Sequence, residues 1–329
     1  MLDPGAAERV AELMRILVDH HGLDWDQSWE ITKAAIGYTN HTLLPEALES
    51  WPVHLFEHVL PRHMQIIYGI NAKLIADAQK RPNCTSDFLA SVSLIDEHNG
   101  RRVRMGQLAF AGAHSINGVS ALHTELMKQS VFRDLNELYP GRINNKTNGI
   151  TPRRWLLEAN PQLTALLNDA VGANVMDDAA LLVKAKPFAT DAAFQQRFAA
   201  IKRHNKDELS NLISARMGLK VDPAAMFDVQ VKRIHEYKRQ LLNILETIAL
   251  YNAIRAHPEK PWAPRVKIFA GKAAASYAQA KLIIKLINDV AQVVNNDPDV
   301  GDLLKVVFVP DYNVSLAEVL IPLLTESGR

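Results

Sequence analysis

The sequence contains very little cysteine: Cys84 is the single one among 329 residues. One thiol cannot form a disulfide within the chain, which excludes a disulfide-stapled secreted scaffold and is typical of a reducing compartment. Long apolar runs are also missing, since no stretch approaches the roughly 20 residues that a membrane-spanning helix requires. Residues 1–20 lack the basic-then-apolar order of a secretion signal. The sequence therefore predicts a soluble cytoplasmic protein with no membrane partner.

An excess of charge of either sign is absent as well. Lys and Arg together number 37 and Asp and Glu 36, which gives a formal net charge of +1. A general nucleic-acid binder needs a basic surplus to neutralise phosphates, so nucleic acid is not expected as a partner. What the sequence does have is length and apolar content. Its 329 residues, 48% of them hydrophobic, suffice for two domains with cores of their own.

The first half of the chain, residues 1–148, is mostly helical in its pattern. Asp24 and Gln27 resemble a capping box, and Pro45 and Pro61 suit the first turns of helices. Strand-like runs on either side of Asn99-Gly100 predict one β-hairpin, formed by residues 92–95 and 102–105. The expected helices lie at about 10–18, 24–35, 46–50, from 61 onwards and 119–128.

The second half, residues 149–329, alternates short apolar runs with helical stretches. This alternation is typical of a parallel, doubly wound α/β sheet. The boundary between the halves is placed at Asn148-Gly149, where helical patterning stops. Strands are expected at 227–231, 266–270 and 306–310, with helices after about 240, over 276–294 and from about 315. In the first of these helices an apolar stripe is formed by Leu241, Leu245, Ile248 and Tyr251.

The most informative stretch is 231–239, at the end of the first of these strands. It holds Lys232, Arg233 and three further titratable or basic side chains, offset by one Glu. Ligands of open parallel sheets bind at such strand ends. Cations just before the N-terminus of a helix are unfavourable, because the helix dipole is positive there. A bound phosphate offsets this repulsion by accepting hydrogen bonds from the cations and the backbone amides. A solvated charged face is the alternative; the location at a strand end favours an anion site.

Two other features are weaker signals. Gly271-Lys272 closes the next strand, and we interpret its small neighbours as tight strand–helix packing rather than a nucleotide loop. His54, Glu57 and His58 match the pattern of inverted zinc peptidases, but Pro61 should end their helix and no third ligand stands out. Exposed helix histidines are therefore the preferred interpretation, and no metal is expected.

Two polar clusters are further candidates, and the first of them suits sugar hydroxyls. His41 lies between Asn and Thr residues in a segment interpreted as a polar loop. Asn148 and Trp155, together with Arg153 and Arg154, form a polar and aromatic cluster at the boundary. The alternative for the second cluster is that its members cap and pack a hinge.

Several long blocks, in the right order, resemble the glycogen/starch/maltodextrin (α-glucan) phosphorylase family. The similarity runs from about residue 10 to about Pro322, and its blocks are Tyr38–Glu49, Leu60–Ile67, Lys146–Trp155, Phe227–Gln240 and Val294–Asp302. The resemblance implies two Rossmann-like domains facing a cleft, the GT-B type of glycosyltransferase fold, present here only in part. Residues 1–148 would then be the C-terminal part of the N-terminal domain, and 149–329 a partial C-terminal domain.

The resemblance also implies a reaction and a cofactor. Family members cleave terminal α-1,4-linked glucose with inorganic phosphate and release glucose 1-phosphate, with pyridoxal phosphate relaying protons through its own phosphate. Carried over by position, Lys232 and Arg233 match phosphate-site residues, Lys232 being near the cofactor, and Trp155 and Tyr312 line the cofactor pocket. The glucose contacts would be His41 and Asn148 at the 6-hydroxyl, Tyr237 at the 2-hydroxyl and His235 nearby. Among these, Lys232, Arg233 and His41 are the candidate catalytic residues.

The chain departs from the family pattern at both ends. It contains no Gly-Thr-Gly-Asn-Met-Lys segment, whose lysine forms the cofactor's Schiff base, and Leu323 to Arg329 leaves the pattern abruptly. We therefore expect an internal fragment that binds no pyridoxal phosphate covalently and has no activity by itself. The alternatives are a truncated non-catalytic remnant or partner-binding fragment and, remotely, a zinc peptidase. A homodimer is the family expectation for the full-length enzyme.

Overall fold

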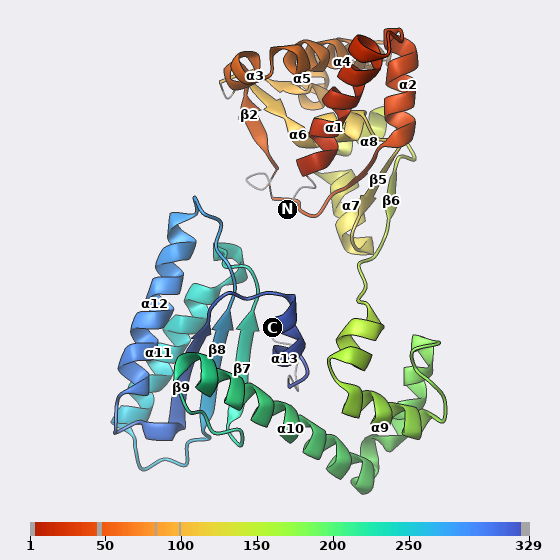
Figure 1. Ribbon diagram of the computed structural model, residues 1–329. Coiled ribbons are helices and arrows are strands. Elements are labelled where there is room, and N and C mark those ends of the chain that lie inside the picture. Colours follow the sequence, from red (N-terminus) through yellow and green to blue (C-terminus); the bar gives the residue numbers. More distant parts are fainter. Residues whose placement is uncertain (1–3, 45–47, 83, 99, 324–329) are drawn as a thin grey trace. The chain divides into compact units, whose positions relative to one another are not determined.

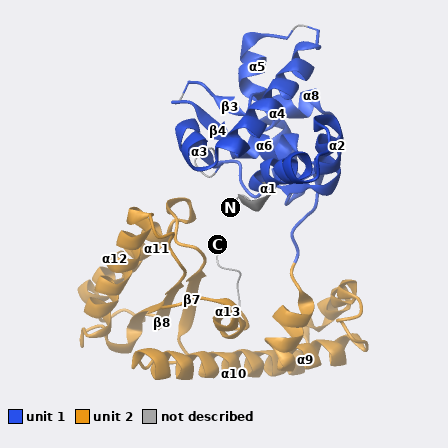
Figure 2. Cartoon of the chain, turned by 45° about the horizontal axis from the view of Figure 1, so that its top comes forward, with its two compact units in different colours: residues 1–149 blue, residues 150–329 orange. Residues whose placement is uncertain are grey.

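The computed structural model describes residues 4–44, 48–82, 84–98 and 100–323. The chain divides into two compact units, residues 1–149 and 150–329, and each is described by itself (Figure 2). Both units combine helices with parallel strands, so the mixed α/β class predicted from the sequence is confirmed. Within the described part of the chain, no helix combines the length and the apolar character needed to cross a membrane.

Unit 1 is built mainly from helices around one apolar core (Figure 1). Asp24 caps α2 by accepting a hydrogen bond from the Gln27 amide at 2.8 Å, as the capping pattern predicted, and Pro61 begins α4. The helices are α1 (Pro4–Arg15, continued by a π-helical turn, Ile16–His20), α2 (Trp25–Ala35), α3 (Val53–Val59), α4 (Pro61–Gln79), α5 (Ser86–Val92), α6 (Met105–Ala111), α7 (Ala121–Gln129) and α8 (Arg133–Leu138).

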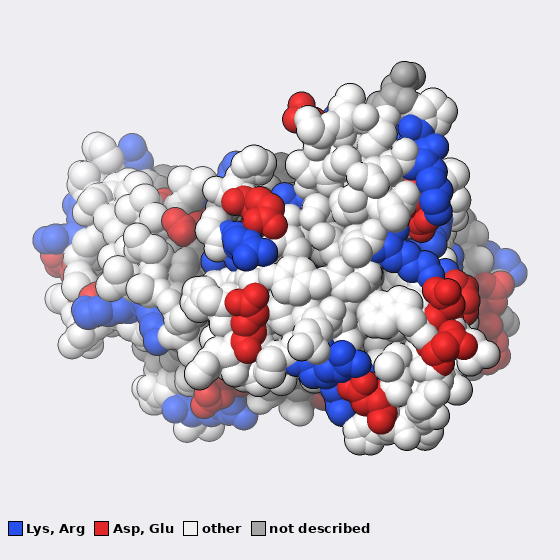
Figure 3. Space-filling model, turned by 90° about the horizontal axis from the view of Figure 1, so that it is seen from above, with Lys and Arg blue, Asp and Glu red and all other residues white. Residues whose placement is uncertain are grey.

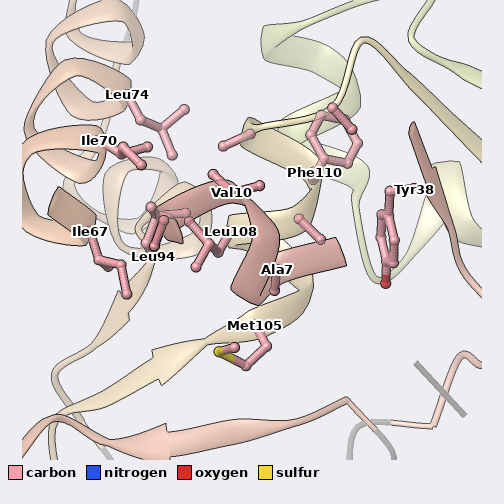
Figure 4. Close-up of a cluster of buried hydrophobic side chains, with 14 of the residues drawn as sticks. Ala7, Val10, Tyr38, Ile67, Ile70, Leu74, Leu94, Met105, Leu108 and Phe110 are labelled. Carbon is pink, nitrogen blue, oxygen red and sulfur yellow. The ribbon is translucent and has the colours of Figure 1, made fainter. Parts of the chain in front are cut away.

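The core of unit 1 lies where α1 packs against α4 and α6 (Figure 4). Val10 and Leu108 are fully buried, and Ile67 and Ile70 of α4 face the same cluster. A Cβ on Gly112 would come within 2.4 Å of Val10, so the close approach of α1 requires glycine there. The helices predicted over 10–18, 24–35, from 61 and over 119–128 are confirmed.

A three-stranded parallel sheet in unit 1 was missed by the sequence interpretation. Its strands are β1 (Gly37–Thr39), β5 (Ser115–Gly118) and β6 (Ile143–Asn145), in the order β1-β5-β6. Strands of three or four residues are too short to display a period of two. The segment around His41, interpreted as a loop, therefore follows directly on a strand.

The predicted β-hairpin is confirmed in its pairing. Ile95 pairs with Val103 and Asp96 with Arg102, which joins β3 (Ile95–Asp96) to β4 (Arg102–Arg104). The strand start expected at Val92 is wrong, because Val92 ends α5. A third strand, β2 (Ser50–Pro52), pairs with the other edge of β4. The short helix expected over 46–50 is wrong where the structure describes it, because residues 48 and 49 are not helical and Ser50 begins β2. Residues 45–47 near Pro45, and Asn99 of the turn, lie outside the described residues.

Unit 2 holds a second parallel sheet, with the order β7-β8-β9, as the alternating pattern predicted. Helices cover both faces of this sheet (Figure 1). The elements are a π-helical segment (Arg153–Glu158), α9 (Pro161–Val171), a 3-10 segment (Ala179–Thr190), α10 (Ala192–Met217), β7 (Met226–Val231), a 3-10 turn (Glu236–Lys238), α11 (Gln240–Ala256), β8 (Arg265–Ala270), α12 (Ala278–Asn295), a 3-10 turn (Gly301–Leu303), β9 (Leu304–Val309) and α13 (Val314–Leu320).

The central strand β8 shows how the two faces are filled. Its residues Val266, Ile268 and Ala270 pack with α10 and α13, whereas Phe269 packs with α11 and α12. The apolar stripe read from the sequence of α11 is not its buried face. Leu241 is 43% and Leu245 49% exposed, while the buried positions include the polar residues Gln240 and Thr247. The pattern was misread because it counted apolar residues alone.

Candidate functional site

The carboxyl ends of the three strands in unit 2 lie at one edge of the sheet. Val231, Ala270 and Val309 end β7, β8 and β9, and they are in register across the sheet. The loops 232–239, 271–277 and 310–313 therefore leave from the same edge. This is the edge at which parallel α/β sheets bind ligands.

The first of these loops, 232–239, is tied closely to the second. The Lys232 amide donates to the carbonyl of Ala270, and the Ile234 amide to the carbonyl of Lys272, each at 3.1 Å. A Cβ on Gly271 would lie 2.1 Å from the Lys232 carbonyl oxygen, so this crossing requires glycine. The sequence interpretation assigned Gly271 to strand–helix packing; the close approach is to a loop backbone instead.

The loop 232–239 presents cations at this edge. The side chain of Lys232 is half-buried and that of Arg233 is exposed, and the exposed Lys272 follows Gly271 on the neighbouring loop. The acid of the same loop, Glu236, accepts a hydrogen bond at 2.5 Å from the hydroxyl of Tyr277. That bond is the main cause that raises the pKa of Tyr277, with burial second. Ammonium and guanidinium groups beside backbone amides can hold a phosphate by charge-assisted hydrogen bonds.

Aromatic rings stand beside these cations. The rings of His235 and Tyr237 have centroids 4.6 Å apart, and His235 meets Tyr277 edge-on at 5.0 Å. Tyr237 is 60% exposed, so its ring and hydroxyl face solvent rather than the core. A polar rim of this kind can contact sugar hydroxyls while the cations hold an anion.

Tyr312 and Trp155 both lie next to α13. Tyr312 precedes that helix in the loop after β9, packs against the core, and has its pKa raised by burial. Trp155 is half-buried on the π-helical segment, which an ion pair at 2.9 Å between Arg154 and Glu318 joins to α13. Asn148, grouped with Trp155 in the sequence interpretation, lies in the other unit.

In unit 1, His41 and Asn148 also follow the carboxyl edge of a parallel sheet. Thr39 ends β1 opposite Asn117 of β5, and His41 follows two residues later. The Asn148 amide donates to the carbonyl of Val119, just past the end of β5, at 2.9 Å. The structure therefore places these two candidates at the same edge of the unit 1 sheet.

His123 of α7 also belongs to this edge of unit 1. Its Nε2 lies 2.9 Å from Oδ1 of the buried Asn40. Burial lowers the pKa of His123, and the charge of His41 lowers it further, so the two histidines are neighbours. They are far apart in sequence, so no spacing could have paired them.

The zinc-peptidase alternative gains nothing from the structure. His54, Glu57 and His58 lie on α3, which ends at Val59 before Pro61, and the Tyr68 hydroxyl donates to Glu57 at 3.2 Å. Among the residues that the structure describes, no three His, Cys, Asp or Glu side chains gather where they could hold a metal ion.

Charges elsewhere on the surface are mixed. On the face drawn in Figure 3, Lys and Arg side chains lie beside Asp and Glu side chains instead of forming one large patch of a single sign. Ion pairs such as Arg62 with Asp19, at 2.6 Å, and Arg197 with Asp169, at 2.7 Å, also bring the two signs together. The loop 232–239 is therefore distinguished by the position of its cations at the strand ends and not by the overall charge of the surface.

Comparison with known proteins places the chain in a family. A family model of carbohydrate phosphorylases matches residues 3–326. The chain is 50% identical over 320 residues to glycogen phosphorylase of Haemophilus influenzae and 49% identical over 322 residues to that of Synechocystis. It is 48% identical over 320 residues to the brain form from Homo sapiens. These alignments cover 97–98% of the chain but 38–39% of the relatives. The chain belongs to the carbohydrate phosphorylase family.

Proposed function

We propose that this chain carries the phosphate-binding residues and part of the glucose-binding residues of an α-glucan phosphorylase. The reaction is the phosphorolysis of terminal α-1,4-glucosidic bonds of glycogen or maltodextrin to glucose 1-phosphate. The observation that carries the proposal is the position of the loop 232–239, whose cations stand at the carboxyl edge of a parallel sheet. Membership of the phosphorylase family supports it.

In this proposal Lys232 and Arg233 hold the substrate phosphate. Their positive charges stabilise negative charge on the phosphate oxygens as the glycosidic bond breaks, an effect that a site shielded from water strengthens. Tyr237 and His235 contact the glucose ring from the same loop. For His41 and Asn148, at the carboxyl edge of the unit 1 sheet, contact with the 6-hydroxyl is proposed from the family resemblance alone. Hydrogen bonds to ring hydroxyls that strengthen as the sugar approaches an oxocarbenium-like state accelerate the reaction.

The residues at the unit 2 edge also fit pyridoxal phosphate. A cation, Lys232, would hold the cofactor phosphate, and the aromatic side chains of Trp155 and Tyr312 would line its ring. When bound, the cofactor supplies a phosphate group that exchanges a proton with the substrate phosphate. Because the 329-residue polypeptide has no Gly-Thr-Gly-Asn-Met-Lys segment, we propose that it forms no Schiff base and is inactive by itself. A stoichiometric adduct on one lysine after borohydride reduction would contradict this.

The proposed fold is the GT-B type. Residues 1–148 would form part of its N-terminal domain and residues 149–329 part of its C-terminal Rossmann-like domain. This proposal is supported by the two parallel sheets, each with candidate residues at its carboxyl edge. We also propose a homodimer and a cytoplasmic location, and membership of the family is the support for both.

Phosphate binding by the purified chain tests the anion site. Calorimetric titration with inorganic phosphate at low salt should give binding that Lys232→Ala and Arg233→Ala each weaken by about tenfold or more, as loss of a charged hydrogen bond does. Lys285→Ala is the matched control, because this exposed lysine pairs with Asp289 on α12. An equal loss in all three variants, or no binding by the wild-type chain, would refute the proposed site.

A further inference from the structure

A lysine is buried in the middle of the unit 2 sheet. Lys267 lies on the central strand β8, is 3% exposed, and is surrounded along that strand by Val266, Ile268 and Phe269. By the alternation of a strand, its side chain points to the face that α11 and α12 cover. An ammonium group in such a place is unfavourable unless partners replace its water.

Three partners surround the Lys267 ammonium. Its Nζ lies 2.5 Å from a carboxylate oxygen of Asp228 on β7 and 2.5 Å from one of Glu246 on α11. It also donates to Oδ1 of Asn243, on the same helix, at 3.2 Å. The ammonium therefore joins two strands and a helix, and one of its three donors is directed at an amide.

From Asn243 the hydrogen bonds continue to the loop 232–239. Nδ2 of Asn243 donates to Oε1 of Gln230 at 3.0 Å, and Nε2 of Gln230 donates to the carbonyl of Lys238 at 3.0 Å. Gln230 is itself buried, at the end of β7. We call this series, from Lys267 through Asn243 and Gln230 to the Lys238 carbonyl, the amide relay.

The direction of the amide relay is fixed from both ends. An ammonium only donates and a backbone carbonyl only accepts, so Asn243 must turn its oxygen to Lys267 and Gln230 must turn its nitrogen to Lys238. If either amide flipped, two donors or two acceptors would face each other inside the sheet. Lys267 thereby sets the orientation of a hydrogen bond made well beyond its own reach.

A second amide holds the other side of the same loop. Gln240, fully buried at the start of α11, donates to the carbonyl of Arg233 at 3.0 Å and accepts from the amide of His235 at 3.3 Å. Arg239, which lies between Lys238 and Gln240 in the sequence, is left-handed, with φ of +61°. The loop therefore keeps its conformation through hydrogen bonds to buried side chains.

We propose that Lys267, acting through Asn243 and Gln230, is a positioning residue that holds the loop 232–239 in its anion-binding conformation. The positioning concerns the main chain, and its consequence for phosphate rests on the function proposed above. Lys267 is 35 residues beyond Lys232 in sequence, as their numbers show, and the relay links it to the loop.

Hydrogen exchange of the 329-residue chain tests the positioning. Asn243→Ala removes the relay but leaves both carboxylates on Lys267. The amides of Lys238 and Arg239 should then exchange about tenfold faster, the change expected for a lost hydrogen bond, while the β8 amides stay within about twofold. Trypsin should cut after Lys238 or Arg239 correspondingly faster. Lys267→Met should act in the same direction.

Tyr251→Phe is the matched control on the same helix. It removes a hydrogen bond of 2.6 Å to Asp297 near the far end of α11 and should leave loop exchange unchanged. The positioning role is overturned if the loop amides of Asn243→Ala exchange at the wild-type rate, or if the β8 amides accelerate equally. If Lys267→Met does not fold, Asn243→Ala alone decides the matter.

Phosphate titration of the same variants separates this inference from the proposed function. Asn243→Ala should weaken phosphate binding about threefold to tenfold. Tyr251→Phe should lose a similar amount of stability but keep the phosphate affinity of the wild-type chain. A loosened loop with unchanged phosphate affinity overturns the claim that positioning serves the anion. Absence of phosphate binding in the wild-type chain refutes the proposed function, while loop exchange still decides whether Lys267 holds the loop.

Discussion

Gly271 faces the carbonyl oxygen of Lys232 so closely that a methyl group cannot fit between them. A Cβ at position 271 would lie 2.1 Å from that oxygen and 3.0 Å from the side chain of Ile234. The obstacle is backbone, which cannot move aside as a side chain does. The close spacing of these two loops at the carboxyl edge of the sheet therefore depends on position 271 having no side chain.

Replacing Gly271 by alanine should displace the loop 232–239 and destabilise unit 2. We expect a loss of about 1–3 kcal/mol, in the range of overpacked sites, together with weaker phosphate binding. Urea unfolding and phosphate titration measure the two effects. Gly37→Ala serves as a control, because its Cβ would meet Ser115 at an ordinary 3.8 Å. A Gly271→Ala chain with wild-type stability and affinity would contradict this close crossing of the two loops.

Removing His41 should raise the pKa of His123. Burial is the larger cause that lowers this pKa and remains in the variant, so His41→Ala should move it only part of the way toward its usual value. NMR titration of the histidine ring signals measures the shift. If the His123 signal titrates identically in both chains, the two residues are not neighbours, and the unit 1 edge is wrongly assembled.

Glu12 should make the chain acid-sensitive. Hydrogen bonds from Arg15, at 2.7 and 2.8 Å, lower its pKa from 4.5 to about 2, burial opposes this, and His63 adds a further lowering contact at 2.8 Å. Since the folded pKa is depressed, the stabilisation is full above about pH 4.5 and is lost as pH falls toward 2. The carboxylate is 41% exposed, so solvent screening limits the effect to about 1 kcal/mol.

Urea unfolding at pH 5 and pH 3 measures this dependence. Glu12→Gln should reduce the loss of stability between the two pH values, whereas Glu8→Gln, at an exposed position of the same helix, should not. Identical pH dependence in wild type and Glu12→Gln would show that the contact with Arg15 does not stabilise the fold.

The alternation of unit 2 could be read from the sequence because its strands are six residues long and apolar. Four of the six residues of β8 (Arg265–Ala270) are apolar, the exceptions being Arg265 and Lys267. The cation-rich stretch follows Val231 at the end of a strand, as expected. The sheet of unit 1 could not be read, since β1 has three residues and pairs with a strand that begins at Ser115. Pairings across such distances leave no periodic trace.

The candidate site was predictable only where its residues are contiguous. One loop holds Lys232, Arg233, His235 and Tyr237. The sequence identified this loop because its cations directly follow a predicted strand. The relay residues Asn243 and Lys267 carried no signal, because one lies on a helix and the other in a strand that reads as apolar. Buried polar partners are chosen by three-dimensional packing, which no local pattern records.

Arg239 has one more consequence. An L-residue at φ of +61° lies in a region that costs about 1 kcal/mol or more, and the first turn of α11 begins directly after it. The hydrogen bond that Gln230 donates to the neighbouring Lys238 carbonyl helps to maintain this backbone conformation against its cost. Glycine at position 239 would remove most of that cost and leave the hydrogen bond to the Lys238 carbonyl in place.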